Sequence, residues 1–304
     1  FTWLFLSISW SQVGFVSSLV YLFEYRLYFM VPVYAAALLC LPNTQNWAFC
    51  AAVTGAVIAL ITSYGLGLGW WTVEGANLSL GNRIYHGFIM SVLLLIALLV
   101  ARDFTGGIRY GAIVIAVLTV YNVLNIEIGR TGYLQVTAVT FTYVALTFRR
   151  LQAVIVGLVV LIVLGVVYVS SDQVNHRVSQ TLTNVENAIF EGGHASSSVG
   201  YRLDFYRGAI QIGADNPLGG VGVGDVVAEL EDRTDSGQMR FTTDNVHSEF
   251  LNMLVAGGLP ALCLFLLFCL SMFWAGFRHR KTNRTTADSL IGMSVIVVVS
   301  AMFN

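Results

Sequence analysis

Charge is scarce in this chain. Charged residues make up 11% of its 304 residues, whereas a soluble globular domain carries about 25%. Hydrophobic residues make up 56%, and the mean hydropathy is +0.73. This composition excludes an ordinary soluble fold and a disordered chain. The net charge of −1 provides no basic field that would attract a nucleic acid. We therefore expect a membrane protein with no nucleic-acid partner.

Cysteine and metal-ligand patterns are also scarce. The four cysteines, Cys40, Cys50, Cys263 and Cys269, lie in or at the edge of apolar runs. The sequence has no C-x-x-C pair or Cys/His cluster that would predict zinc, and no carboxylate cluster that suits Mg²⁺. We expect packing cysteines, no disulfide framework, and neither a metal nor another cofactor.

Long apolar runs occupy most of the sequence. A spanning helix needs roughly 20 such residues, and lipid requires its backbone to satisfy its own hydrogen bonds. Nine runs qualify as candidates: Phe1–Leu22, Leu27–Leu41, Trp47–Gly69, Ile84–Ala101, Tyr110–Gly129, Thr131–Phe148, Leu151–Ser170, His247–Phe277 and Asp288–Phe303. We predict an all-α, polytopic helical bundle, with about seven helices in residues 1–170 and about two in residues 247–304. Because the sequence starts inside an apolar run and stops just after another, we expect it to be a fragment.

Basic residues gather on alternate connections between these runs. The fourth, sixth and eighth connections hold Arg102, Arg109, Arg149, Arg150, Arg278, Arg280, Lys281 and Arg284. The short odd-numbered connections hold one arginine each, and each also holds an acidic residue. Since positive charge favours the cytoplasmic side, the odd-numbered connections are predicted to be external.

The seventh connection, residues 171–246, is a long polar loop that this rule places outside. It holds five arginines and eleven acidic residues, a net charge of −6. Apolar residues recur at helical spacing after Ser198, and Pro217 limits that helix, which suits a short helix at the membrane surface. The glycine run 219–224 predicts a tight turn that brings backbone close to a helix or a ligand. Glu229–Gly237 is predicted to be an acidic, mobile loop.

Three arginines of the external side are candidates for binding an anion. Arg130 follows Gly129 in a break between two helices, where its guanidinium and the next helix start favour an anion. It can also simply snorkel to the interface or pair with Glu127. Arg202 and Arg207 lie in the helix predicted from Ser198, about 140° apart around its axis, so they cannot both point at one small target without help. The alternative is that both simply line a solvated face of this helix.

His247 is the candidate for a general base. Asp244 or Asn245 suits an N-cap, which would place His247 in the first helical turn. The positive end of the helix dipole disfavours an imidazolium there, so we expect a neutral ring near pH 7. The alternative is that His247 caps the helix or bonds a loop carbonyl.

These candidates fall in segments that form a recognisable series. The segments are Arg202-Leu-x-Phe-Tyr, Asn216-Pro-Leu-Gly-Gly-Val-Gly-Val-Gly224 and His247-Ser-x₉-Gly258. Together they resemble the signature region of the O-antigen ligase and O-antigen polymerase superfamily. Arg130-x₃-Leu134 resembles the short arginine motif of the ligases. The motifs cover residues 125–262, and the chain departs from the family in reading Gly258-Leu-Pro-Ala261 after the histidine.

The resemblance implies a metal-independent glycosyltransferase in the inner membrane of a Gram-negative bacterium, with its site facing the periplasm. The donor would be a glycan on undecaprenyl pyrophosphate, and the acceptor a sugar hydroxyl on lipid A–core. Carried over by position, Arg130 and Arg202 would bind the pyrophosphate and His247 would deprotonate the acceptor. Supporting candidates are Arg207, Ser248, Tyr133 and Gly222. The resemblance also implies a whole protein of about twelve spanning helices.

Other readings remain open at this point. An O-antigen polymerase or a protein O-oligosaccharyltransferase shares the scaffold and differs in its acceptor. A secondary transporter is the alternative of a different class. It would be expected to have ionisable residues near the midplane and a pair of broken helices in repeated halves, and no such pair appears in the sequence. Here Glu24, Arg26, Glu127 and Arg130 fall near helix ends.

Overall fold

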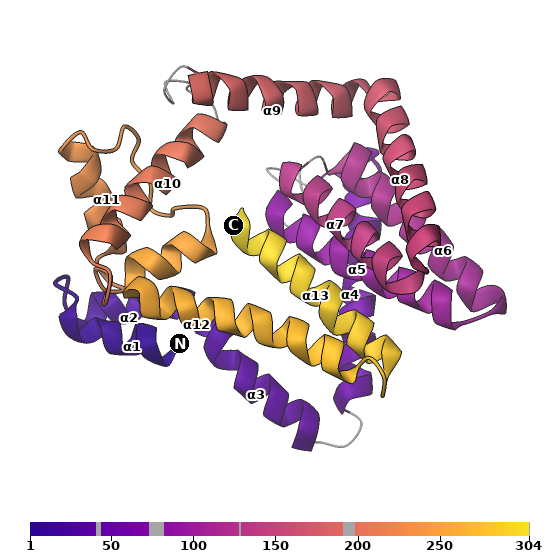
Figure 1. The fold of residues 1–304 in the computed structure, drawn as a ribbon, viewed down its shortest axis with the longest axis horizontal. Coiled ribbons are helices and arrows are strands. Elements are labelled where there is room, and N and C mark those ends of the chain that lie inside the picture. Colours follow the sequence, from indigo (N-terminus) through magenta and orange to yellow (C-terminus); the bar gives the residue numbers. More distant parts are fainter. Residues whose placement is uncertain (41–43, 73–81, 128, 191–197, 304) are drawn as a thin grey trace. The chain divides into compact units, whose positions relative to one another are not determined.

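A computed structural model describes residues 1–40, 44–72, 82–127, 129–190 and 198–303 (Figure 1). Within these ranges the chain is 83% helical and holds no strand. The elements are α1 (Thr2–Ser7), η1 (Ile8–Trp10), α2 (Phe15–Glu24), α3 (Arg26–Cys40), α4 (Thr44–Gly67), α5 (Arg83–Asp103), α6 (Gly106–Tyr121), the π-helical η2 (Asn122–Ile126), α7 (Arg130–Thr147), α8 (Arg150–Ser170), α9 (Asp172–Phe190), α10 (Ser198–Asp215), α11 (Val226–Asp235), α12 (Glu249–His279) and α13 (Arg284–Met302).

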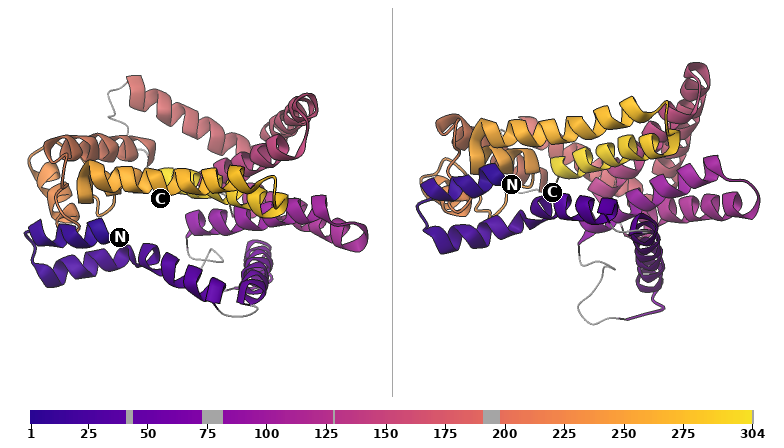
Figure 2. Two further views of the ribbon diagram at one scale, coloured as in Figure 1. Left: turned by 60° about the horizontal axis from the view of Figure 1, so that its bottom comes forward. Right: turned by 90° about the horizontal axis from the view of Figure 1, so that it is seen from below.

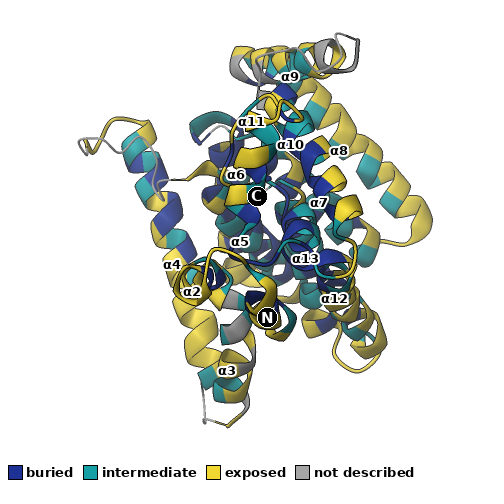
Figure 3. Ribbon diagram, turned by 90° about the vertical axis from the view of Figure 1, so that its left-hand side faces the viewer, coloured by how far each residue is buried: buried dark blue, intermediate teal, exposed yellow. Residues whose placement is uncertain are grey.

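Six helices in the described part are long and apolar enough to cross a membrane: α4, α5, α6 continued by η2, α8, α12 and α13. None of the residues of α8 is buried, and its apolar side chains are open to the surroundings (Figure 3). The predicted fold class, an all-α polytopic membrane protein, is confirmed. At 15 residues, α3 is shorter than the roughly 20 that a span needs.

The first predicted span, Phe1–Leu22, is wrong as a single helix. The chain turns between η1 and α2, where Gly14 adopts a φ of 89°. The backbone N–H groups of Gln12 and Val13 donate to the two carboxylate oxygens of Asp225, at 2.5 and 2.9 Å. A distant carboxylate thus takes the donors that a continuous helix would use, which hydropathy alone does not reveal.

The described chain forms two compact units. The first comprises Phe1–Trp47, Gln180–Phe268 and Ala301–Asn304, and the second comprises Ala48–Ser179 and Cys269–Ser300. Both units therefore combine residues that are far apart in sequence.

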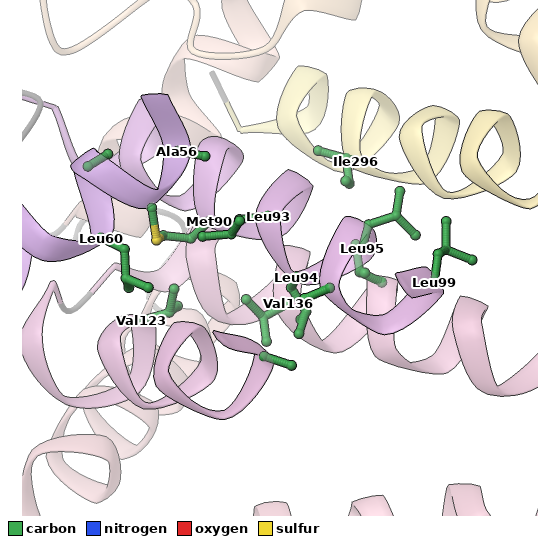
Figure 4. Close-up of a cluster of buried hydrophobic side chains, with 14 residues drawn as sticks. Ala56, Leu60, Met90, Leu93, Leu94, Leu95, Leu99, Val123, Val136 and Ile296 are labelled. Atoms are coloured by element: carbon green, nitrogen blue, oxygen red, sulfur yellow. The ribbon is translucent and has the colours of Figure 1, made fainter. Parts of the chain in front are cut away.

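Close packing of α4, α5, α6, η2, α7 and α13 forms the apolar core of the second unit (Figure 4). Met90, Leu93 and Ile296 are among its fully buried side chains. A polar chain runs beside this core, because His86 Nε2 lies 2.8 Å from Asn122 Oδ1 and Asn122 Nδ2 donates to Ser63 Oγ at 2.8 Å. These buried polar groups satisfy one another, as an apolar environment requires.

A buried carboxylate ties the basic end of the same unit. The Asp288 side chain has no exposed surface, and it pairs with Arg102 at 2.5 Å, Arg280 at 2.8 Å and Arg284 at 3.5 Å. Arg280 and Arg284 also donate to the carbonyl of Leu146 at the end of α7. Three of the basic residues counted for topology are thus part of a structural ion cluster joining α5, α7, α12 and α13.

A break in α12 organises the first unit. Gly258 adopts a φ of 68° and a ψ of −164°, and the next residue but one, Pro260, has no N–H to offer the helix. The glycine run replaces the missing bonds, because Val221 N donates to Val255 O at 2.9 Å and Gly222 N donates to Ala256 O at 3.1 Å. The prediction that this run brings backbone close to a helix is confirmed.

The N-terminal segment contacts the glycine run, and Figure 2 shows this indigo segment beside the orange part of the chain. Val223 N donates to Ser7 Oγ at 3.0 Å, and Trp3 Nε1 donates to Gly257 O at 2.7 Å. A Cβ on Gly220 would come within 2.6 Å of the Gly257 nitrogen, so a side chain does not fit there. Close backbone approach therefore explains the glycines of this run.

The long polar loop is largely helical in its described part. The predicted helix after Ser198 is α10, which ends at Asp215, just before Pro217. The predicted acidic loop Glu229–Gly237 is wrong for most of its length, because α11 covers it to Asp235 and buries Leu230. Arg233 compensates the acidic residues by pairing with Glu229 at 2.7 Å and with Asp215 at 2.8 Å. The charged residues around Leu230 suggested a loop, although Leu230 lies on the buried face of a helix.

Candidate functional site

His247 stands just before α12 rather than inside it. The helix begins at Glu249, and the carbonyl of Ser248 accepts its first described bond, from Asn252 N at 2.8 Å. His247 has a φ of 59°, and it is the only residue other than glycine with a positive φ in the described chain. The predicted position in the first helical turn is therefore wrong. Such a conformation is unfavourable for histidine and persists only where the surroundings impose it.

Hydrogen bonds to its backbone hold His247 in this conformation. His247 N donates to Asn245 Oδ1 at 2.7 Å, and Asn252 Nδ2 donates to the same oxygen at 3.2 Å. Asn252 Oδ1 in turn accepts from Val246 N at 3.3 Å. From the other side, the Tyr206 hydroxyl donates to His247 O at 3.2 Å. Asn245 was expected as a helix N-cap, but instead it braces the turn.

The imidazole ring of His247 is half-buried, and no hydrogen bond joins it to another described residue. Its centroid lies 6.0 Å from that of Phe205, a buried residue of α10. The main chain of His247 is thus bonded on both sides while both ring nitrogens keep their capacity for a proton or a ligand. This arrangement suits a base that must reach a substrate.

α10 forms the wall next to this turn. Asp204 Oδ2 accepts from Arg240 N at 2.8 Å and from Phe241 N at 3.3 Å. The ring of Tyr201 meets that of Phe241 edge to face, with centroids 4.3 Å apart. These contacts fasten α10 to the segment that leads to His247, within the first unit.

Arg202 shares one face of α10 with Tyr206, since the two are four residues apart. Arg202 is half-buried and pairs with no carboxylate in the described chain. Burial raises the pKa of Tyr206, and the positive charge of Arg202 opposes that rise. Arg202 and His247 thus both lie near Tyr206.

The supporting candidates of this unit differ in their settings. Arg207 is exposed on α10, as expected from its angular separation from Arg202. Ser248 is buried at the start of α12. Gly222 is buried at a φ of 94°, bonded to the broken part of α12. A role for any of them at a site stays a prediction.

Arg130 belongs to the second unit, where it is the first residue of α7. The π-helical η2 ends at Ile126, and Gly129 is the N-cap of α7, so the predicted break between two helices is present. Tyr133 is half-buried, and its hydroxyl donates to Leu124 O at 3.4 Å. The structure thus places Arg130 at the orphan N–H groups of a helix start, with Tyr133 one turn on. Arg130 and His247 thus belong to different units.

Two residues near these candidates, Tyr206 and Arg83, were not predicted from the sequence. Tyr206 holds His247 through its hydroxyl, and its position four residues after Arg202 was the available signal. Arg83, at the start of α5, has its Cβ 3.5 Å from the place of a Cβ on Gly129. The backbone end of a second arginine side chain therefore lies close to the Arg130 break, and only the fold reveals this proximity.

A buried carboxylate follows the histidine directly. Glu249 is buried, and the Tyr28 hydroxyl donates to its Oε1 at 2.8 Å. In the part of the chain that the structure describes, no group of three or more His, Cys, Asp or Glu residues is placed to hold a metal ion. Glu249 thus takes part in packing α3 against α12.

Comparison with known families gives one match. Residues 112–266 match the family model described as O-antigen ligase, and this stretch includes Arg130, Arg202 and His247. A search of curated proteins finds no match. The matched stretch covers half of the chain and ends shortly after the break in α12.

Proposed function

The chain belongs to the O-antigen ligase family, and on that premise we propose that it transfers O-antigen polysaccharide to lipid A–core at the periplasmic face of the inner membrane. The donor is the glycan on undecaprenyl pyrophosphate, and the acceptor is a core sugar hydroxyl. One observation carries the proposal: in the matched stretch, the main chain of His247 is held on both sides while its ring makes no hydrogen bond to described residues.

The proposed reaction is a single displacement. The acceptor oxygen attacks the anomeric carbon of the donor sugar, and the bond from that carbon to the pyrophosphate oxygen breaks. His247, as a neutral imidazole, takes the proton of the attacking hydroxyl. Undecaprenyl pyrophosphate leaves with the bonding electrons. Because attack and departure occur on opposite faces of the anomeric carbon, the product has inverted configuration.

Charge stabilisation of the leaving group falls to arginine. A sugar pyrophosphate is a good leaving group, so it needs its developing charge neutralised more than it needs a proton. A guanidinium supplies paired, charge-assisted hydrogen bonds without a metal ion. Arg202, half-buried and without a carboxylate partner in the described chain, supports this role. We assign the second contact to Arg130 at the start of α7, with Arg207, Ser248, Tyr133 and Gly222 in supporting positions.

Deletion of the gene in its own cell tests the proposal. We expect the lipopolysaccharide ladder to disappear on a gel while long lipid-linked polymer accumulates. Wild-type protein should restore the ladder. His247→Ala should not restore it, since loss of a general base costs about 10²–10⁴-fold in rate. Equal amounts of folded protein in the membrane, checked by thermal melting of the purified variant, are the control. A ladder restored by His247→Ala contradicts the base assignment.

The same experiment separates the alternatives. A ladder collapsed to a single repeat would indicate a polymerase. An unchanged ladder would exclude both activities, and loss of glycan from proteins would then indicate an O-oligosaccharyltransferase. A transporter predicts that purified protein with donor and acceptor transfers nothing. Transfer by purified protein therefore excludes that class.

A further inference from the structure

We propose that a polar cavity of the first unit, which we call the α11 cavity, binds one neutral or amino-bearing sugar of a glycan substrate. The proposal rests on the proposed function and adds a binding site to it. The cavity has a volume of about 460 Å³, which lies in the range of small-molecule sites, about 300–1,000 Å³. Its lining includes Trp10, Gln12, Asn216, Gly220, Asp225 and Glu229.

Trp10 offers an anchored aromatic surface. Its Nε1 donates to Gly219 O at 3.2 Å, and its ring lies against that of Trp3, with centroids 6.0 Å apart. Trp10 nevertheless remains 38% exposed. A sugar ring has one face of C–H groups that packs on such a surface, while its hydroxyls need polar partners. A rigid indole at the wall of a polar cavity meets the first requirement.

Polar groups of the cavity meet the second requirement. Asp225 accepts the N–H groups of Gln12 and Val13, so this wall is held in place while its oxygens keep further lone pairs. Glu229 Oε1 accepts from Arg233, which leaves Oε2 for a ligand. Asn216 Nδ2 donates to Ile212 O, so its amide oxygen is oriented as an acceptor. The groups left over are mainly acceptors, which suit the hydroxyls of a sugar.

Charge selects among sugars. Two carboxylates, Asp225 and Glu229, line the cavity, and no basic side chain does. Arg233 compensates the charge of Glu229, but Asp225 pairs with no basic side chain in the described chain, so its charge repels the carboxylate of a sugar acid. A neutral sugar avoids that repulsion, and a protonated amino sugar gains from the carboxylates. The cavity therefore excludes uronic acids.

The distance of the cavity from His247 determines which kinetic constant it affects. Asn216 lies ten residues after Tyr206, a distance of about 15 Å along α10 at 1.5 Å per residue. The bound sugar is therefore remote from the proton transferred at His247. Its binding energy should appear mainly in the Michaelis constant of one substrate rather than in the chemical step.

Filling the cavity tests the proposal without removing any existing contact. Ala228 lines the cavity and is exposed on α11, so Ala228→Trp blocks the space. Ala214→Trp, at an exposed position of α10 outside the lining, is the matched control. The full-length protein in lipid nanodiscs receives lipid-linked polysaccharide and lipid A–core purified from its own cell. We expect Ala228→Trp to raise the Michaelis constant about five- to tenfold, which is the worth of one aromatic contact, with kcat unchanged.

The arms of the assay identify the source of the sugar. A raised constant for the lipid-linked polysaccharide assigns the cavity to the donor, and a raised constant for lipid A–core assigns it to the acceptor. Trp10→Ala should have the same effect, and Trp10→Phe a smaller one, because the aromatic face remains. If the Michaelis constants of Ala228→Trp are unchanged, the proposal is overturned. That result would be expected if Trp10 only anchors η1 at the membrane surface.

A second readout separates this proposal from the proposed function. Polysaccharide released from lipopolysaccharide by mild acid should quench or shift the indole fluorescence of His247→Ala protein, and this change should be lost on adding Ala228→Trp. Active His247→Ala protein contradicts the base assignment alone. If His247→Ala protein is inactive and still binds the released polysaccharide after Ala228→Trp is added, only the proposed sugar site in the α11 cavity is contradicted.

Discussion

Arginines occur in two contrasting settings in this molecule. In the second unit, Arg102, Arg280 and Arg284 surround the fully buried carboxylate of Asp288. In the first unit, Arg202 is half-buried on α10 and pairs with no carboxylate in the described chain. The first set uses its hydrogen bonds and ion pairs to hold helices together. Arg202 keeps that capacity, and such an arginine can bind an anion without first giving up a partner.

Asp288→Asn should show the largest effect on stability. The substitution keeps the size of the side chain and removes the charge that three guanidiniums share, so it should cost about 3 kcal/mol of unfolding free energy. Denaturant unfolding of the purified protein in detergent measures this loss. Asp215→Asn is the control, because Asp215 is 57% exposed where it pairs with Arg233 and should cost less than about 1 kcal/mol. Equal losses in the two variants would contradict a special role of the buried cluster.

Arg202→Ala should lower activity and leave stability unchanged, the opposite of the effect expected for Asp288→Asn on stability. We expect transfer to fall about 30-fold, corresponding to one lost charge-assisted contact of about 2 kcal/mol, with stability unchanged. Arg202→Lys should recover only part of the activity, because an ammonium cannot bind in a bidentate fashion. Arg207→Ala, five residues on and exposed, should lose less. Full activity in Arg202→Lys would contradict bidentate recognition of the pyrophosphate.

The contrast between these two arginine settings could be predicted only in part from the sequence. Local patterns were sufficient for α10, for the break before Arg130 and for the turn at the glycine run, since each depends on spacing and on glycine or proline. The Asp288 cluster could not be predicted, because Arg102 and Asp288 are 186 residues apart in sequence. The setting of His247 was mistaken for two reasons: Tyr206 donates to its carbonyl from a helix 41 residues away in sequence, and the Asn245 side chain accepts from its N–H instead of capping α12.

Tyr206→Phe should sharpen the comparison within the first unit. The hydroxyl donates to His247 O and to Met302 O, at 3.2 and 3.1 Å. Loss of the hydroxyl removes a hydrogen bond worth about 1 kcal/mol that positions His247. We therefore expect kcat to fall about fivefold with the Michaelis constants unchanged. Tyr201→Phe is the matched control, because the Tyr201 ring packs on Phe241 and no hydrogen bond of its hydroxyl joins it to described residues. A Michaelis constant that rises without a fall in kcat would contradict a positioning role.

The pH dependence of stability gives the smallest effect and reports on Arg202 directly. Burial raises the pKa of Tyr206 above that of an unfolded tyrosine, and the charge of Arg202 limits the rise. Above about pH 10 the unfolded chain loses the phenolic proton that the folded chain retains, so stability falls with pH, by less than about 1 kcal/mol for a half-buried group. The difference in stability between wild type and Tyr206→Phe, measured from pH 9 to 11, should show this fall. Arg202→Ala should make the fall larger, because the folded pKa then rises further. If Arg202→Ala leaves this fall in stability unchanged, the charge of Arg202 does not act on Tyr206. That result would contradict the conclusion that Arg202 and His247 both lie near Tyr206.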